Sequence, residues 1–255
     1  MKLYTESYPN EGAPELVLLH GWGMSSDIWQ PLLPELSRRY SLTLIDLPGL
    51  GRSPALPEPL TLSSVVDALL SAAPETANWL GWSLGGQLAL ACAAAAPERV
   101  ERLVTVASNP CFVQCDDWDC AMEEAVFAGF ETALQDQPAK TLTRFMMLQT
   151  QGAEAGKETL KQLREIQQSL SHAMLPQTLQ LLREDCRELL AKLSMPVMQI
   201  FGERDQLVPQ SVAQACASLT GRFSHLYSGA GHLPFLSHPD LFCQDLKAFL
   251  ERPVG

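Results

Sequence analysis

Short apolar runs alternate with stretches of helical periodicity along most of this chain. The runs are four to six residues long and cover residues 16–19, 42–45, 78–81, 102–107, 196–201 and 224–227. Strands separated by helices pair in parallel, because each helix carries the chain back across one face of the sheet. The sequence therefore predicts the α/β class, with a mostly parallel central sheet, helices on both faces and a closing helix over residues 241–250.

The alternation is interrupted between residues 116 and 193, where only helical periodicity is present. Helices are expected over residues 121–134, 139–150, 157–170 and 176–190. We predict that residues 1–110 and 194–255 form the core and that residues 111–193 form a helical lid inserted in it. Parallel sheets carry their sites at the carboxyl ends of the strands, so such an insertion is expected to cover the site.

The composition limits the classes of function. A chain of 255 residues with 46% apolar side chains can bury one large sheet core. Its formal charge of −11 disfavours binding of nucleic acid through phosphate contacts. No run approaches the roughly 18 apolar residues of a membrane span, and the first residues lack a signal-peptide stretch. We expect a cytoplasmic protein, most simply a monomer, that binds neither nucleic acid nor membranes.

Seven cysteines cannot all pair within the chain. Cys111, Cys115 and Cys120 cluster, but their spacing is not the Cys-x2-Cys of zinc sites and no histidine lies near them. Reduced thiols are the simpler interpretation, and a metal site is the alternative. We expect no metal and no organic cofactor.

The segment Gly81-Trp82-Ser83-Leu84-Gly85 connects an apolar strand to an Ala-rich helix. Gly-x-Ser-x-Gly in that setting is typical of a tight turn that lifts a serine hydroxyl above the sheet. An idle serine in a glycine-rich turn is the alternative, but the flanking strand and helix favour the first interpretation. Ser83 is therefore the candidate nucleophile.

A serine nucleophile needs a base, and five histidines are candidates. The base is expected at His232, because Gly229–Phe235 is a glycine-rich loop after the last predicted strand. The other four are expected to have structural or solvated roles: His20, His172, His225 and His238.

The orienting acid is expected in the turn that follows residues 196–201. Asp205 and Glu203 both lie there, and Asp205 is preferred because Glu203 is expected to pair with Arg204 or to face water. The order Ser83, Asp205, His232 is also the order in which one class of triad enzymes carries these groups.

An oxyanion that forms at Ser83 needs two N–H donors. The expected donors are the backbone groups of Leu84, which follows the nucleophile, and of Trp22, in the loop after an early strand. The side chains of Trp22 and Trp82 either line an acyl pocket or pack as ordinary aromatic residues.

These features together resemble the α/β-hydrolase superfamily, whose fold carries a helical lid. Within it the chain resembles the pimeloyl-acyl-carrier-protein methyl ester carboxylesterases of biotin synthesis. The resemblance covers nearly the whole chain and rests on residues 19–24, 46–53, 82–86, 107–112, 144–150 and 232–239.

The resemblance implies a serine carboxylesterase that releases methanol from a pimeloyl chain held by acyl carrier protein. It implies substrate contacts at Trp22, Ser83, Leu84, Phe145, Met146, Met147, Leu148, Gln149 and His232. It also implies that basic residues meet the acidic carrier, here Lys140, Arg144, Lys157 and Lys161. Three of these are lysines where the family typically has arginine, so a point charge replaces a bidentate donor. A solvated helix face is the alternative role for them.

Three other functions remain open from the sequence. A related hydrolase could use the same triad on another small ester or on a C–C bond. A binding protein could retain the triad as a ligand pocket. A relative of the cofactor-free haloperoxidases would share the same three residues.

Overall fold

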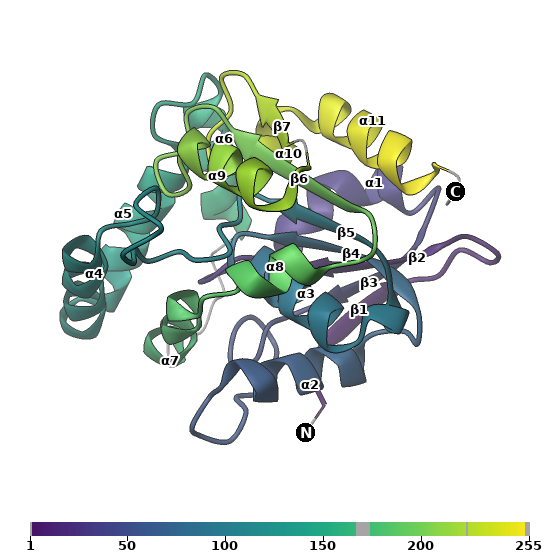
Figure 1. Ribbon diagram of the computed structural model, residues 1–255, viewed down its shortest axis with the longest axis horizontal. Coiled ribbons are helices and arrows are strands. Elements are labelled where there is room, and N and C mark those ends of the chain that lie inside the picture. The colour runs from purple at the N-terminus through teal and green to yellow at the C-terminus, as the bar shows by residue number, and fades with distance from the viewer. Residues whose placement is uncertain (1, 167–173, 223, 253–255) are drawn as a thin grey trace.

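The computed structural model describes residues 2–166, 174–222 and 224–252. Its centre is a seven-stranded sheet in the order β1-β3-β2-β4-β5-β6-β7 (Figure 1). The strands are β1 (Thr5–Tyr8), β2 (Glu15–Leu19), β3 (Ser41–Ile45), β4 (Ala77–Trp82), β5 (Val100–Val106), β6 (Val197–Gly202) and β7 (Ser224–Tyr227). Only the pairing of β1 with β3 is antiparallel among these. The predicted class and the mostly parallel sheet are confirmed.

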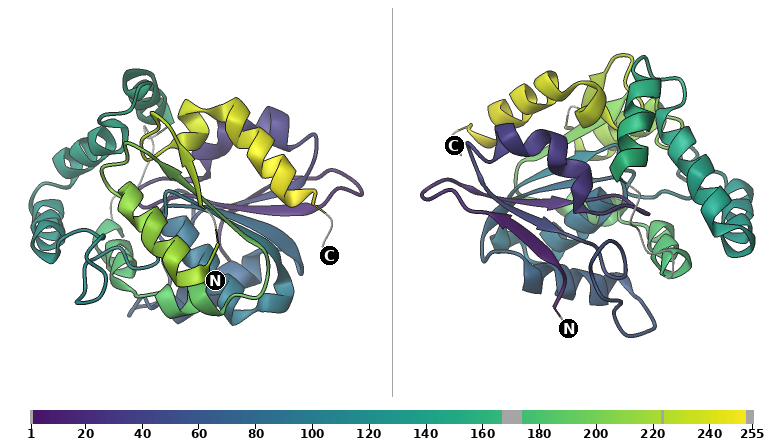
Figure 2. Two further views of the ribbon diagram at one scale, coloured as in Figure 1. Left: turned by 45° about the horizontal axis from the view of Figure 1, so that its top comes forward. Right: turned by 180° about the vertical axis from the view of Figure 1, so that it is seen from behind.

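Helices cover both faces of the sheet (Figure 2). In β2, Val17 and Leu19 join one apolar cluster while Leu16 and Leu18 join the other, as the two-residue period of a strand requires. One face carries α2 (Leu62–Ala72), α3 (Leu84–Ala95), α8 (Arg187–Lys192) and α9 (Gln210–Thr220). The other face carries the 3-10 helix Ser26–Leu32, α1 (Leu33–Leu36), α10 (Pro234–Ser237) and α11 (Pro239–Leu250).

Four of the described helices between β5 and β6 gather at one end of the sheet (Figure 1). These cap helices are α4 (Glu124–Asp136), α5 (Pro138–Thr150), α6 (Gly156–Ile166) and α7 (Leu175–Gln180). The backbone of Glu154 donates to Gly229 and the indole of Trp22 donates to Leu175. The cap helices therefore contact the loops that follow β7 and β2, at the carboxyl edge of the sheet. The division of the chain at residues 111 and 193 stays a prediction.

Two features differ from the sequence-based expectations. The helix expected over 176–190 is broken into α7, a 3-10 turn (Leu181–Arg183) and α8. The break occurs because the N–H of Cys186 donates to Pro110 and Asp185 pairs with Cys111, which draws this backbone out of the helix. The polar edge strand β1 was not predicted. The last residues of the helix expected over 157–170 lie outside the described residues.

No helix in the described ranges is long and apolar enough to cross a membrane.

Candidate active site

Ser83 occupies the turn between β4 and α3, with φ 55° and ψ −120°. This left-handed backbone is unfavourable for a residue with a side chain, and a strained turn of this kind is typical of functional sites. A Cβ atom on Gly81 would overlap the backbone carbonyl of Gly85, and one on Gly85 would overlap that of His20. The spacing of the two glycines is therefore a steric requirement of the turn.

A line of hydrogen bonds joins Ser83 to two buried groups. The Nε2 atom of His232 lies 3.0 Å from Ser83 Oγ, and its Nδ1 atom lies 2.7 Å from Asp205 Oδ2. The other carboxylate oxygen of Asp205 accepts hydrogen bonds from the N–H groups of Leu207 and Val208, at 2.8 and 3.0 Å. Such a geometry lets a carboxylate orient an imidazole that withdraws a proton from a hydroxyl.

The backbone of His232 is held on both sides. Its N–H donates to the carbonyl of Gln149 in α5, at 3.0 Å. Its carbonyl accepts from the indole N–H of Trp82, at 2.8 Å. The Trp82 ring also packs against the imidazole and against Phe235, with both pairs of ring centroids 5.6 Å apart. Trp82 thus lies beside the imidazole and supports it.

Glu203 was expected either to pair with Arg204 or to face water, and its exposure confirms the second alternative. Glu203 is exposed and accepts hydrogen bonds from the N–H of Gly229 and the hydroxyl of Ser228, and these lower the pKa of its carboxyl. Arg204 instead pairs with Glu154 near the start of α6, at 3.3 Å. The reason is that the loop after β7 presents free donors to Glu203 while α6 brings a carboxylate to Arg204.

The three other histidines of the described residues make their side-chain hydrogen bonds with groups other than Ser83. His225 is exposed on β7 and lies 3.3 Å from Asp245, and His238 caps α11. His20 is fully buried; its Nδ1 donates to the carbonyl of Gly21 and its Nε2 accepts from the N–H of Leu47. Burial lowers the pKa of His20, so the ring is neutral. His172 lies outside the described residues.

The loop after β2 abuts the nucleophile. A Cβ atom on Gly21 would lie 3.3 Å from the Cβ of Ser83 and 2.9 Å from the ring of Trp82. Leu84 is the first residue of α3, so its N–H has no acceptor within that helix. The positions of the Trp22 loop and of Leu84 are therefore compatible with an oxyanion site, which stays a prediction.

An apolar chamber lies under the cap helices. Its lining includes Phe112, Phe127, Phe130, Phe145, Leu148, Leu179 and Leu207. The Trp22 ring reaches two of these, with centroids 5.6 Å from Phe130 and 5.1 Å from Phe145. The chamber therefore begins beside the loop that abuts Ser83. Phe127 and Phe130 were not singled out from the sequence, although two aromatic residues three apart on one helix were a usable signal.

The structure separates the remaining residues of α5. Met146 is buried in the other apolar cluster, with Trp82 and Leu233, whereas Met147 is 51% exposed on the outer surface. Gln149 is 1% exposed, and neither polar atom of its amide has a hydrogen-bond partner among the described residues. Phe145 and Leu148 thus line the chamber and Gln149 is buried, while Met147 is not part of the chamber.

The four predicted carrier contacts all lie on the surface of the cap helices. Lys140 and Arg144 are exposed on α5 and border a hollow of about 420 Å³ together with Phe130 and Leu148. Lys157 and Lys161 are exposed on α6, which packs beside α5. The hollow shares Phe130 and Leu148 with the apolar chamber. Lys140 and Arg144 therefore lie at the outer side of the chamber.

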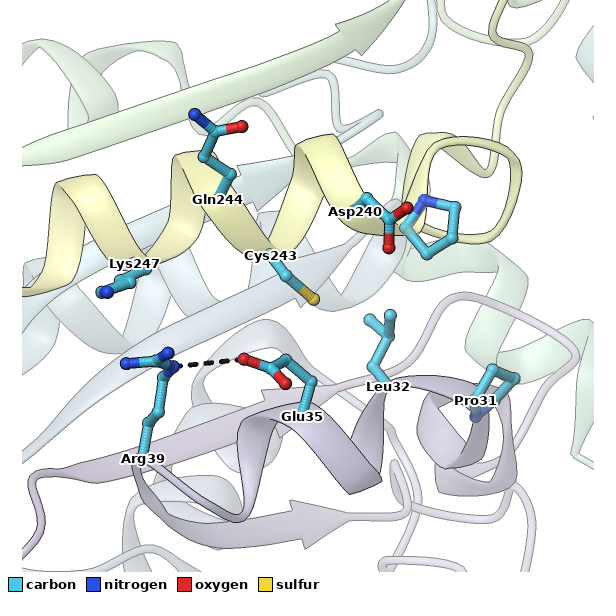
Figure 3. Close-up of a pocket in the computed structure, with 9 residues that line it drawn as sticks. Pro31, Leu32, Glu35, Arg39, Asp240, Cys243, Gln244 and Lys247 are labelled. Carbon is cyan, nitrogen blue, oxygen red and sulfur yellow. Dashed lines mark hydrogen bonds and ion pairs between the residues drawn. The ribbon is translucent and has the colours of Figure 1, made fainter.

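Another hollow lies between α1 and α11 (Figure 3). Glu35 and Arg39 pair across one side of it at 3.2 Å, and Cys243 points into it from α11. None of Ser83, Asp205 or His232 lines it. It therefore has no part in the chemistry described above.

One group of possible metal ligands is present in the described part of the chain. The sulfur atoms of Cys111 and Cys115 and a carboxylate oxygen of Asp185 lie within 4.8 Å of one another. The guanidinium of Arg187 donates to both Cys115 and Asp185, at 3.2 and 2.7 Å. A positive charge of the protein already bridges these groups.

Comparisons with known proteins agree with this geometry. The family model described as alpha/beta hydrolase fold matches residues 14–239. The pimeloyl-[acyl-carrier protein] methyl ester esterase of Klebsiella pneumoniae is 41% identical over 247 residues, which are 95% of this chain and 95% of that protein. The protein of the same name from Edwardsiella ictaluri is 41% identical over 246 residues, 94% of each chain. A solved esterase from Exiguobacterium antarcticum has a TM-score of 0.84 at 20% identity, covering 98% of this chain and 96% of that one, and shows the likeness of fold.

Proposed function

This chain belongs to the α/β-hydrolase family, and we propose that it is a serine carboxylesterase that cleaves the methyl ester of pimeloyl-acyl-carrier protein in biotin biosynthesis. The observation that carries the proposal of catalysis is the hydrogen-bonded line from Asp205 through His232 to Ser83. The choice of substrate rests on the 41% identity to relatives that bear this activity in their names.

We propose that the first half of the reaction acylates Ser83. His232, oriented by Asp205, takes the hydroxyl proton as Ser83 Oγ attacks the ester carbonyl. The N–H groups of Trp22 and Leu84 stabilise the oxyanion, and protonated His232 then gives its proton to departing methanol. Removing one such donor typically costs about 10²–10³ in turnover.

The second half of the reaction returns the enzyme to its resting state. A water molecule gives its proton to His232 and attacks the acyl-enzyme, and the proton then passes to Ser83 as the free acid leaves. The apolar chamber beside Trp22 accepts the methylene chain of the substrate, with Phe145 and Leu148 among its walls.

Basic side chains on the cap helices are proposed to hold the acidic carrier protein. The chain as a whole has a formal charge of −11, so an acidic partner needs a local basic surface. Lys140 and Arg144 meet this need at the rim of the hollow that leads toward Phe130, and Lys157 and Lys161 extend it on α6. Carrier binding should weaken as salt rises, because exposed charges are screened.

The role of Ser83 is tested by the Ser83→Ala variant, with methanol release from the carrier-bound ester as the assay. Turnover should fall by about 10⁶ while the fold survives, as in other triad enzymes. A variant that retains a tenth of the rate would refute the assignment. Restoration of biotin-independent growth to cells that lack their own esterase, with Ser83→Ala as the inactive control, tests the pathway.

The carrier surface is tested by charge reversal. Lys140→Glu combined with Arg144→Glu should raise KM for the carrier-bound ester more than KM for the same ester on a short thiol, and the difference should shrink at high salt. Lys247→Glu, an exposed lysine on α11, is the matched control and should leave the ratio of the two KM values unchanged. Equal effects of the two changes on that ratio would contradict the assignment of this surface.

A further inference from the structure

Two cysteines of the segment after β5 are in contact. The Sγ atoms of Cys111 and Cys115 lie 3.9 Å apart, which is van der Waals distance for two thiols. Cys111 is 4% exposed, whereas Cys115 is exposed at the surface. The pair therefore combines one thiol that a dissolved oxidant can reach with a second thiol immediately behind it.

The surrounding contacts anchor the backbone around both cysteines. The N–H of Cys111 donates to the side chain of Asn109, and Cys111 pairs with Asp185 in an isolated β-bridge. The backbone of Cys115 forms a tight turn with Trp118, whose N–H donates to its carbonyl at 2.9 Å. Segments on both sides of the pair are thus anchored to other parts of the fold.

A guanidinium group lies against the exposed thiol. Arg187 donates to Cys115 Sγ at 3.2 Å and is itself held by Asp117 and Asp185, at 2.8 and 2.7 Å. A metal ion at these sulfurs would have to displace this cation from two carboxylates. The thiol of Cys115 also donates to Asp117 at 3.4 Å, and cysteine reacts with oxidants as its thiolate. The contacts therefore favour thiol chemistry over metal binding.

We propose that Cys111 and Cys115 are a modification site that forms a reversible disulfide when the protein meets hydrogen peroxide. The sulfur atoms need to approach by about 2 Å to reach the length of a disulfide bond. The bond would close a short loop over residues 111–115, most of which are buried. It would also bracket Phe112, which lines the apolar chamber.

The chemistry proceeds in two balanced steps. Cys115 gives up its proton and its sulfur attacks one peroxide oxygen; the O–O bond breaks, a sulfenic acid forms, and the departing hydroxide takes up that proton as water. Cys111 then loses its proton and attacks the Cys115 sulfur; the S–S bond forms, the S–O bond breaks and hydroxide leaves with that proton as water. Two thiols and one peroxide thus give one disulfide and two waters, and a dithiol reductant reverses the change.

The order of the two cysteines follows from their environments. Burial and the nearby charges of Asp185 and Cys115 raise the pKa of Cys111 to about 12. Cys111 is therefore a thiol at neutral pH and does not react first.

The test uses the full-length protein and mass spectrometry. The protein is treated with a graded series of peroxide concentrations, unfolded in denaturant, alkylated, and cleaved by trypsin and a protease that cuts before aspartate. Because Arg102 and Asp116 flank the segment, the peptide 103–115 contains Cys111 and Cys115 and no other cysteine. We expect this peptide to lose two hydrogen atoms in mass and both alkyl groups, and dithiothreitol to restore both.

Three single variants complete the test. Cys120→Ser removes the third cysteine of the cluster and should form the same disulfide at the same peroxide concentration. Cys115→Ser should leave Cys111 fully alkylated, and Cys111→Ser should leave Cys115 as an oxidised single thiol. A cross-link to the peptide that carries Cys120 would overturn the proposal. Oxidation of Cys115 to sulfinic acid with Cys111 still alkylated would overturn it equally, and neither result depends on esterase activity.

Discussion

Replacing Asp205 by asparagine should reverse the tautomer of His232. In the native protein Asp205 Oδ1 accepts from the N–H groups of Leu207 and Val208, while Oδ2 faces His232 Nδ1 at 2.7 Å. Two fixed N–H donors require an oxygen at the Oδ1 position of the variant. The amide NH₂ group must therefore occupy the Oδ2 position and donate to the imidazole.

This orientation leaves the imidazole unable to act as a base. Nδ1 becomes the acceptor, so Nε2 carries the proton and donates toward Ser83 Oγ instead of accepting from it. The same substitution in another triad enzyme, which preserves geometry and selects the wrong tautomer, lowers kcat about 10⁴-fold. We expect a similar loss here, equivalent to about 5.5 kcal/mol of transition-state stabilisation.

The assay is kcat for methanol release, with thermal unfolding as the measure of fold. Asp205→Asn is nearly isosteric and keeps both backbone hydrogen bonds, so the melting temperature should change little. Glu203→Gln is the matched control, because this neighbouring carboxylate contacts Ser228 and Gly229 and does not contact the imidazole. Its kcat should stay within a few-fold of the native value. If Asp205→Asn retained a tenth of the native kcat, or if Glu203→Gln lost as much, the reasoning would be refuted.

Two further predictions concern stability. Gly85→Ala should lower the free energy of unfolding by about 1–3 kcal/mol or more, because its Cβ would overlap the carbonyl of His20. Gly129→Ala on α4 is the control: its Cβ meets nothing within 4 Å, so the free energy of unfolding should rise by about 0.4–1 kcal/mol. Denaturant unfolding measures both changes. Burial lowers the pKa of His20, so the unfolded chain binds a proton that the folded chain does not, and stability should fall as pH drops below about 6.5. His20→Gln should flatten that acid limb of thermal unfolding; an acid limb as steep as that of the native protein would count against the assignment.

Local steric rules explain which parts of the site could be predicted. The turn at Ser83 was predictable because its geometry excludes a Cβ atom at positions 81 and 85. Only glycine fits at these two positions, and the Gly-x-Ser-x-Gly pattern is therefore visible in the sequence. The strands were predictable from their apolar runs. The antiparallel edge strand β1 was not, because its residues Thr5–Tyr8 are polar and carry little apolar signal. The broken helix after residue 180 depends on the contact of Cys186 with Pro110, which no local pattern encodes.

The contacts that join the cap helices to the candidate site do not depend on which residue types stand at the accepting positions. His232 donates its N–H to the backbone carbonyl of Gln149, and Trp22 donates its indole N–H to the carbonyl of Leu175. Every residue type offers such a carbonyl, so neither position is constrained in a way that a motif can record. By contrast, the acid that faces His232 must be a carboxylate, which is why Asp205 could be predicted. Sequence reasoning therefore reached the groups that need a particular side chain and missed the backbone contacts that hold those groups in place.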